Sequence, residues 1–366
     1  MKFINKYLRN LAPYKVASNK VWEVSDEQRK SILKLDWNEA TIPPSPKVKE
    51  RLKKLVEKED VYFLYPSTNN DEILQRLSIY TKLPVDNVQY FASSDSLHEY
   101  LVRMYITVGD PILVLGPTYD NFRLTSQAQG AVVNYFNYED DFSIDEDKFI
   151  KSINQLSPSL VYICNPNNPS GNLLSKEFLK KIIQKFPETI FLVDEAYYEF
   201  SSQTIADEVV NFPNLFVSRT FSKAFGIANF RAGYLISDVN NIQQLSKIRN
   251  PKNFTTFAQE AVIAVLSDVD YMEKYVSEVN EAKKWFSIEL YKLDFVEQVF
   301  ESHANFVLVK FTNFDTKMNV YNKLIENNIF VRNLLHSDLL INTLRISIGT
   351  KEQMNIVVDV LKKVKS

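Results

Sequence analysis

The feature that most limits how this chain can fold is an alternation of short apolar segments with helical patterns over residues 88–236. The helical patterns include residues 97–106 and 176–186. Short strands that are apolar on both faces and alternate with helices are typical of a mostly parallel sheet covered by helices on both sides. We therefore predict an α/β fold built around such a sheet. The predicted strands are residues 88–92, 112–115, 131–136, 160–164, 190–193, 215–218 and 232–236.

Beyond residue 250 the pattern changes to one that is typical of an α+β unit. We predict helices over residues 257–266, 271–290, 317–327 and 351–363, and strands over residues 296–300, 306–311 and 344–348. A chain of 366 residues has room for two domains of roughly 150 residues each. We predict a large domain over residues 46–255, and a small domain made of residues 256–366 with residues 1–45 as its N-terminal arm.

Composition and charge exclude several classes of protein. The chain has 43 basic and 45 acidic side chains, so no overall basic field favours nucleic acid or an anionic membrane as a partner. Cys164 is the single cysteine, and His98, His303 and His336 show no metal-ligand spacing, so we expect no disulfide and no metal and read the histidines as structural or surface residues. Because the sequence has neither a signal-peptide core nor an apolar run near the ~18 residues of a membrane span, we expect a cytoplasmic protein.

Three polar segments follow three consecutive predicted strands, at the edge where open α/β sheets bind ligands. The first, NPNNPSG over residues 165–171, is a stiff loop that can present an asparagine amide. The second, DEAY over 194–197, puts a carboxylate at the end of an apolar strand, where it costs free energy unless it is paired. The third, SRTFSKAFG over 218–226, gathers hydroxyls and a lysine, with Arg231 and Gly233 soon after.

Each segment alone has an ordinary structural explanation, as a turn, a helix N-cap or a solvated loop. Together they supply a lysine, an acid and a set of hydroxyls and cations that suits a phosphate dianion. A desolvated lysine beside other cations has a lowered pKa and becomes nucleophilic toward carbonyls. Pyridoxal 5′-phosphate (PLP) needs a lysine for its aldehyde, an acid for its ring nitrogen and an anchor for its phosphate. The three segments therefore predict PLP as the cofactor.

The segments NPNNPSG, DEAYYEF and RTFSKAFGIANFRAGY resemble the signature of the fold-type I PLP-dependent aminotransferases, and most of all their histidinol-phosphate aminotransferase-like branch. The resemblance runs over almost the whole chain, from RNLAPY (residues 9–14) and KLDWNEA (34–40) to IFVRN (329–333) and LRISIGT (344–350). It implies the fold-type I architecture, with a mostly parallel central sheet in a large domain and a smaller α+β domain.

The resemblance also implies a role for each matching residue near the cofactor. Lys223 would hold PLP as a Schiff base and afterwards move the proton of the reaction. Asp194 would keep the ring nitrogen protonated, and Tyr197 and Asn168 would hydrogen-bond the ring 3′-oxygen. The residues expected to hold the phosphate or stack on the ring are Ser94, Asp95, Tyr119, Thr220, Ser222 and Arg231.

Four further residues are implied at the substrate and at a subunit boundary. Arg345 would bind the substrate carboxylate with help from Asn38, and Arg332 would bind the substrate's own phosphate, although its ordinary reading is a surface arginine on a strand. Tyr65 would reach the cofactor phosphate of a neighbouring subunit, which implies a homodimer with shared active sites.

The chain departs from the family pattern in three places that surround the substrate side chain. Ser93 stands where the family has a glycine, a change that is tolerated if its φ stays negative. Residues 40–44 and 249–254 also differ from the usual pattern. We therefore predict an aminotransferase that takes the amino group of glutamate, yielding 2-oxoglutarate, and passes it to a small carbonyl compound, with a phosphorylated one favoured.

Two candidate acceptors fit this prediction: imidazole acetol phosphate, and a three-carbon ketone phosphate such as dihydroxyacetone phosphate. The alternatives are a PLP-dependent decarboxylase of a phosphorylated amino acid and a regulator that keeps the fold without catalysis. A nicotinamide enzyme is disfavoured because the sequence contains no GxGxxG.

Overall fold

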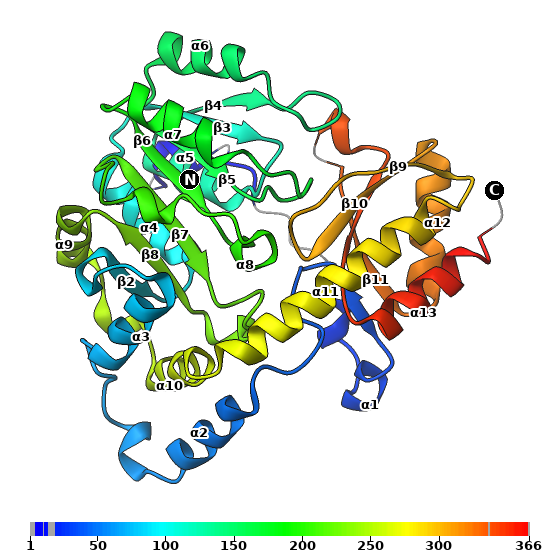
Figure 1. The fold of residues 1–366 in the computed structure, drawn as a ribbon, viewed down its shortest axis with the longest axis horizontal. Helices are drawn as coiled ribbons and strands as arrows, with labels where there is room; N and C mark the ends of the chain where they lie inside the picture. Colours follow the sequence, from blue (N-terminus) through cyan, green and yellow to red (C-terminus); the bar gives the residue numbers. More distant parts are fainter. Residues whose placement is uncertain (1–3, 10, 14–18, 336, 365–366) are drawn as a thin grey trace.

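Two β-sheets organise the chain (Figure 1). The computed structural model describes residues 4–9, 11–13, 19–335 and 337–364, so His336 and part of the RNLAPY segment lie outside the described residues. The larger sheet has seven strands in the order β2-β8-β7-β6-β5-β3-β4, and the smaller has five in the order β1-β11-β12-β10-β9. Among the described residues, every helix is too short or too polar to cross a lipid bilayer.

The seven-stranded sheet confirms all seven strands predicted between residues 88 and 236. Its strands are β2 (Val88–Phe91), β3 (Pro111–Gly116), β4 (Val132–Asn137), β5 (Leu160–Cys164), β6 (Ile190–Asp194), β7 (Leu215–Thr220) and β8 (Gly233–Ser237). The neighbours β4, β3, β5, β6 and β7 pair in parallel, whereas β8 is antiparallel to both β7 and β2. The sheet is thus mostly parallel, and its central strands β5, β6 and β7 are buried at every residue except Ile190.

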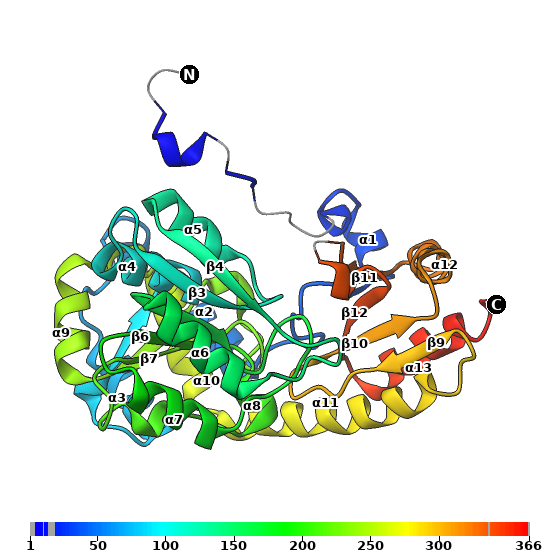
Figure 2. The same cartoon turned by 90° about the horizontal axis from the view of Figure 1, so that it is seen from above.

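Helices cover both faces of this sheet, as its connections require. They are α4 (Ser94–Tyr105), α5 (Asn121–Gln129), α6 (Glu146–Leu156), α7 (Lys176–Lys185) and α9 (Val239–Ile248). Connections between parallel strands are right-handed, so α4 and α5, whose connections run toward β4, lie on one face. The helix α7, whose connection runs the other way, lies on the opposite face (Figure 2).

The five-stranded sheet joins the two ends of the chain. Its strands are β1 (Leu33–Leu35), β9 (Val296–Val299), β10 (Phe306–Phe311), β11 (Ile329–Asn333) and β12 (Thr343–Ser347). Helices α11 (Val269–Leu290) and α12 (Phe314–Glu326) pack on the sheet, and α13 (Lys351–Leu361) packs on both helices. The predicted strands and helices of this region are confirmed, but β1 and β11 were not among the predicted strands. The strand β1, with three residues, is too short to show a periodicity.

The division into domains at residues 45/46 and 255/256 stays a prediction. The remaining α-helices of the described chain are α1 (Asp26–Arg29), α2 (Pro46–Val56), α3 (Asp71–Thr81), α8 (Tyr198–Ser201) and α10 (Thr256–Leu266). The helix α10 begins directly after the second proposed boundary and packs against α2 and α3, which precede the seven-stranded sheet. The strand β1 pairs in parallel with β11 and so brings the segment before residue 46 onto the five-stranded sheet.

The turn between β2 and α4 presses closely against β8. A Cβ on Gly233 would lie 2.6 Å from the backbone nitrogen of Ser94 and 2.9 Å from the carbonyl oxygen of Arg219, so only glycine fits there. Ser93 itself has φ 91° and ψ 159°, a backbone conformation that is essentially reserved for glycine. The condition of a negative φ at Ser93 is therefore not met. Ser93 is the N-cap of α4, and its hydroxyl accepts a hydrogen bond from the backbone of Ser96 at 3.1 Å.

Replacing Ser93 by glycine should stabilise the protein by about 1 kcal/mol, because the strain relieved exceeds the loss of the cap and the added freedom of the unfolded chain. Urea unfolding of the two proteins measures the difference. Ser175→Gly is the matched control, since Ser175 caps α7 in the same way at a φ of −66°. That control should lose stability, and a Ser93→Gly protein that is no more stable than the parent would contradict the strain at this turn.

Candidate active site

The three polar segments meet at one edge of the seven-stranded sheet. The loop 165–171 follows β5, Asp194 ends β6 and Thr220 ends β7. Because these strands are parallel neighbours, their carboxyl ends lie together. Residues of the five-stranded sheet and of the segment after β1 reach the same place, so the two sheets face each other across the candidate site.

The hydroxyl of Tyr197 is the point where side chains from both sheets converge. It accepts hydrogen bonds from Nδ2 of Asn168 at 3.2 Å and from Nδ2 of Asn38 at 3.0 Å. Arg345 on β12 donates to Oδ1 of Asn168 at 2.5 Å and to the carbonyl oxygen of Asp36 at 2.6 Å. Four of the residues that the sequence analysis singled out are thus in one hydrogen-bonded group.

Asn38 is held rigidly in this group. It has φ 57°, and its backbone N–H donates to the hydroxyl of Ser347 on β12 at 3.0 Å. That hydroxyl donates in turn to Oδ1 of Asn38, and Asn305 donates to the Asn38 carbonyl oxygen at 3.1 Å. With its other groups engaged, the Asn38 amide nitrogen is fixed toward Tyr197.

Lys223 lies beside the same group. Its Nζ lies 5.8 Å from the centre of the Tyr197 ring and donates to the carbonyl oxygen of Trp37 at 2.9 Å. Burial, and then the positive charge of Arg345, lower the pKa of Lys223 to about 8. An amine with this pKa is largely neutral slightly above pH 8, which is the form that attacks a carbonyl carbon.

Asp194 is a buried carboxylate with a neutral hydrogen-bond donor on each oxygen. The Tyr162 hydroxyl donates to Oδ2 at 3.0 Å and the Ser218 hydroxyl to Oδ1 at 3.1 Å. Burial raises the pKa of Asp194, while His98, Tyr162 and Ser218 oppose the increase. No lysine or arginine of the described chain forms an ion pair with it, so a protonated ring nitrogen is the kind of cation that this carboxylate could bind.

The residues predicted to bind a phosphate surround the start of α4. Thr220 pairs with Gly233 in the sheet, and Gly233 is in turn packed against the backbone nitrogen of Ser94. The Thr220 hydroxyl donates to the Ser222 hydroxyl at 2.9 Å. Hydroxyls beside the first N–H groups of a helix form a site that favours an anion.

Asp95 joins the remaining members of this group. Its Oδ2 lies 3.3 Å from Nη2 of the half-exposed Arg231, and its Oδ1 accepts hydrogen bonds from the Tyr119 hydroxyl at 3.1 Å and from Asn121 at 3.0 Å. Arg231 is therefore held near the start of α4, where its guanidinium could also bind an anion.

Arg332 and Arg345 are direct partners across the antiparallel pair β11 and β12. Residues that face each other in this way project from the same side of the sheet, and like charges there are destabilising unless an anion lies between them. Tyr65 is the one predicted residue placed apart from the group. Its side chain is 78% exposed, and its ring lies 4.7 Å from Nζ of Lys252.

Several residues of the site were not predicted. Tyr162 and Ser218 hold Asp194, and the carbonyl oxygens of Asp36 and Trp37 hold Arg345 and Lys223. Backbone carbonyl partners leave no trace in the sequence, and the pairing of Ser218 with Asp194 depends on strand register. The position of His98 beside the site could have been predicted from the sequence. It lies three residues after Asp95, which is about one turn further along α4.

The residues present fit PLP. A neutralisable lysine, a buried carboxylate, a phenol with two amide donors and a hydroxyl-lined helix start are the groups that this cofactor requires. A metal is not suggested, since no group of three or more histidine, cysteine or acidic residues in the described ranges is placed to bind one.

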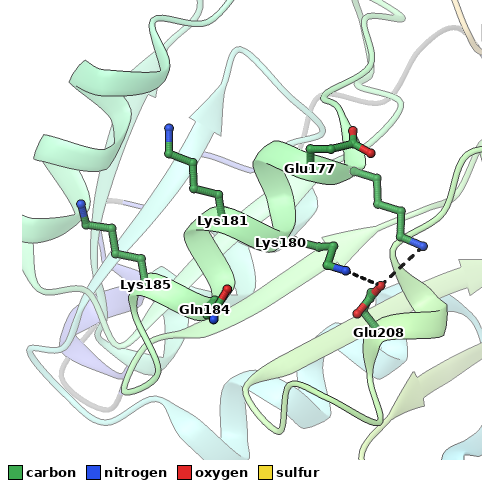
Figure 3. A pocket seen from close by; sticks show the side chains of 7 residues that line it. Glu177, Lys180, Lys181, Gln184, Lys185 and Glu208 are labelled. Atoms are coloured by element: carbon green, nitrogen blue, oxygen red, sulfur yellow. Dashed lines mark hydrogen bonds and ion pairs between the residues drawn. The ribbon is translucent and has the colours of Figure 1, made fainter.

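A separate surface hollow of about 730 Å³ carries no such chemistry (Figure 3). Its lining comes from α7 and Glu208. Two of its four lysines pair with that carboxylate, Lys180 at 2.8 Å and Lys176 at 3.7 Å. None of the residues described above takes part in it.

Comparisons with known proteins agree with this geometry. The model of the family aminotransferase class I and II matches residues 30–361. A dihydroxyacetone phosphate transaminase from Campylobacter jejuni is 40% identical over 362 residues, which are 98% of this chain and 96% of that protein. A histidinol-phosphate aminotransferase from Ruminiclostridium cellulolyticum is 31% identical over 362 residues, 98% of this chain and 97% of that one.

A solved structure shows the same fold over the full length. The crystal structure of histidinol-phosphate aminotransferase from Sinorhizobium meliloti in complex with pyridoxal-5′-phosphate matches with a TM-score of 0.88 and 22% identity. The match covers 100% of this chain and 99% of that chain.

Replacing Lys223 by methionine should stabilise the cofactor-free protein at pH 7. The unfolded lysine has an ordinary pKa of 10.5 and the folded one about 8, so below pH 8 folding buries a charged amine at a cost in free energy. After allowance for the lost hydrogen bond to Trp37, we expect the free energy of unfolding to rise by about 1–2 kcal/mol. The gain should shrink as the pH rises from 8 to 10.5, since the folded lysine is then neutral.

Urea unfolding of the cofactor-free proteins at pH 7 and pH 9.5 measures this change. Lys151→Met, at an exposed lysine on α6, is the control and should give the same difference at both pH values. A Lys223→Met protein whose stability relative to the parent does not change with pH would contradict the lowered pKa.

Proposed function

Because the chain belongs to the aminotransferase class I and II family, we propose that this PLP-dependent enzyme transfers an amino group from glutamate to a small phosphorylated ketone. The observation that carries the proposal is Lys223, whose pKa is lowered to about 8 and whose Nζ lies 5.8 Å from the Tyr197 ring, at the sheet edge where β6 ends in the buried carboxylate Asp194. We propose that it acts in the cytoplasm, where glutamate is abundant.

The cofactor supplies an aldehyde that takes up the amino group and a ring that draws electrons from the substrate's α-carbon. Lys223 would hold the cofactor at its aldehyde carbon. Once the substrate amine has displaced it, the freed Nζ would take the proton from the substrate's α-carbon and deliver it to that former aldehyde carbon. Asp194 would hold the proton on the ring nitrogen. Tyr197 and Asn168 would donate to the ring oxygen, and Tyr119 would cover one face of the ring.

The cofactor phosphate would be bound at the start of α4. The hydroxyls of Thr220 and Ser222 and the guanidinium of Arg231 would bind its oxygens, together with backbone N–H groups of Ser94 and Asp95. In this arrangement Arg231 would move from the Asp95 carboxylate, now 3.3 Å away, toward the stronger charge of the phosphate.

The two opposed arginines support a site that binds two different anions, one on the amino donor and one on the acceptor. Arg345 would bind the carboxylate of glutamate, with Asn38 beside it, and Arg332 would bind the phosphate of the ketone. Because Arg332 and Arg345 are direct partners across β11 and β12, each of these anions would bind close to the positive charge of both residues. A three-carbon ketone phosphate such as dihydroxyacetone phosphate is the acceptor we favour, because the chain departs from the family pattern around the substrate side chain.

We also propose a homodimer with shared active sites. The segment that carries Tyr65 is unusually apolar and exposed: Tyr62 is 66%, Phe63 74%, Leu64 59% and Tyr65 78% exposed. Consecutive exposed apolar side chains of this size mark a surface that binds another protein. A second copy of the chain would bury them and bring Tyr65 to the partner's cofactor phosphate.

The amino acceptor is tested with a panel of ketones in the presence of glutamate. Formation of 2-oxoglutarate should be fastest with dihydroxyacetone phosphate, slower with imidazole acetol phosphate and slowest with unphosphorylated dihydroxyacetone. Release of carbon dioxide from a phosphorylated amino acid, without any need for a keto acid, would instead show the decarboxylase alternative.

Replacing Arg332 by glutamine should lower kcat/KM for the phosphorylated ketone about 10- to 100-fold, the effect of losing a hydrogen-bonded charge pair. The value for unphosphorylated dihydroxyacetone should stay within about twofold, because that ketone has no group for Arg332 to bind. An equal loss for both ketones would remove Arg332 from phosphate recognition.

Shared active sites are tested by mixing two inactive variants, Tyr65→Ala and Lys223→Ala. If Tyr65 acts across the dimer, a hybrid has one site with its own Lys223 and the partner's intact Tyr65, so mixing should restore activity. Each variant incubated alone is the control. Activity that stays at the level of the separate variants after subunit exchange would show that Tyr65 acts within its own subunit or not at all.

A further inference from the structure

A buried row of three polar side chains lies behind the proposed cofactor site, and the proposed function uses only its last member. His98 on α4 contacts the Ser218 hydroxyl through Nε2 at 2.9 Å, and that hydroxyl contacts Oδ1 of Asp194 at 3.1 Å. His98 is 1%, Ser218 0% and Asp194 3% exposed, so water does not compete for these contacts. The other oxygen of Asp194 is engaged by Tyr162.

The hydrogen atoms available to these side chains determine which group donates and which accepts in each hydrogen bond of the row. An ionised carboxylate only accepts, so the single hydroxyl hydrogen of Ser218 points to Asp194. The Ser218 oxygen must then accept from His98, whose Nε2 therefore carries a hydrogen. His98 polarises Ser218, and Ser218 donates to Asp194, without any proton being transferred along the row.

The surroundings of His98 argue against a role in packing alone. Its ring contacts Phe122 and Tyr162 edge-on, with ring centres 5.9 Å and 5.8 Å away. Its other nitrogen, Nδ1, is buried and has no hydrogen-bond partner within the part of the chain that the structure describes. An unsatisfied buried polar atom costs free energy, so an apolar side chain would serve better if filling space were the only requirement.

We propose that His98 is a positioning residue for the reaction: by donating through Nε2 to Ser218, it holds the Asp194 carboxylate ionised and aligned on the ring nitrogen of the cofactor. The inference rests on the proposed function, because it concerns the residue assigned to that nitrogen. Among the groups around Asp194, His98, Tyr162 and Ser218 lower its pKa, and Asp95 raises it.

Removing the Nε2 donor of His98 should change the basicity of the Lys223 nitrogen, which is bonded to the cofactor away from Asp194. Without that donor, Asp194 becomes more basic and draws the proton away from the ring nitrogen. A less positive ring leaves the nitrogen of Lys223 more basic once it is bonded to the cofactor. The pH at which the visible absorbance of the PLP-loaded protein changes should therefore rise.

The experiment titrates that absorbance with pH in the PLP-loaded parent and in His98→Leu, His98→Gln and His98→Asn. We expect His98→Leu to raise the midpoint by about one pH unit, which is a tenfold change in the equilibrium. The kcat for glutamate should fall about tenfold, with KM changed less. His98→Gln can place an amide donor near the position of Nε2 and should restore the midpoint, whereas His98→Asn is too short to do so.

Two controls separate this role from general damage. His303→Gln, at a histidine whose ring contacts Glu301 rather than the row, should leave the midpoint unchanged. In a Ser218→Ala protein the link is already broken, so His98→Leu should add no further shift.

An unchanged midpoint in His98→Leu, or the same shift with and without Ser218, would overturn the proposal. If His98→Leu does not fold, equal midpoints for the glutamine and asparagine variants would overturn it equally. A parent protein that shows no visible absorbance with PLP would instead reject the proposed function itself.

Discussion

A carboxylate buried at the end of a central strand is the constraint on which the site depends. Asp194 is 3% exposed and ends β6, and its two oxygens are engaged by neutral hydroxyls. A buried negative charge of this kind is stable only beside a compensating cation. The protonated ring nitrogen of PLP is such a cation, so the proposed contact with Asp194 would both compensate this buried charge and keep the ring nitrogen protonated.

The site also depends on hydrogen bonds that join the five-stranded sheet and the segment after β1 to the loops at the edge of the seven-stranded sheet. Arg345 lies on the five-stranded sheet and Asn38 in the segment after β1, and they contact Asn168 and Tyr197 in the segments that follow β5 and β6. The groups proposed to bind the substrate are thus joined directly to those proposed to bind the cofactor. The positive charge of Arg345 also helps to lower the pKa of Lys223, so a residue proposed for substrate binding influences the amine proposed for the chemistry.

Much of this was accessible from the sequence, for physical reasons that differ between elements. The central strands of the large sheet were found because they are apolar on both faces and are followed by turn residues or a helix, as at 160–164 and 190–193. The three polar segments were grouped correctly because parallel neighbours end at the same edge. The strand β1 escaped notice because it is three residues long, and the φ of Ser93 could not be read because it results from the close approach of β8 at Gly233. Contacts made through strand register or backbone carbonyls, such as Ser218 with Asp194 or Trp37 with Lys223, exist only once the chain is folded.

The central claim is that Lys223 is the residue that bonds to PLP. It is tested most directly by reducing the PLP-loaded protein with borohydride, digesting it and locating the added pyridoxyl mass among the peptides. The account predicts the mass on Lys223 in nearly every molecule. Its attachment to another lysine, or peptides that all remain unmodified, would contradict the account.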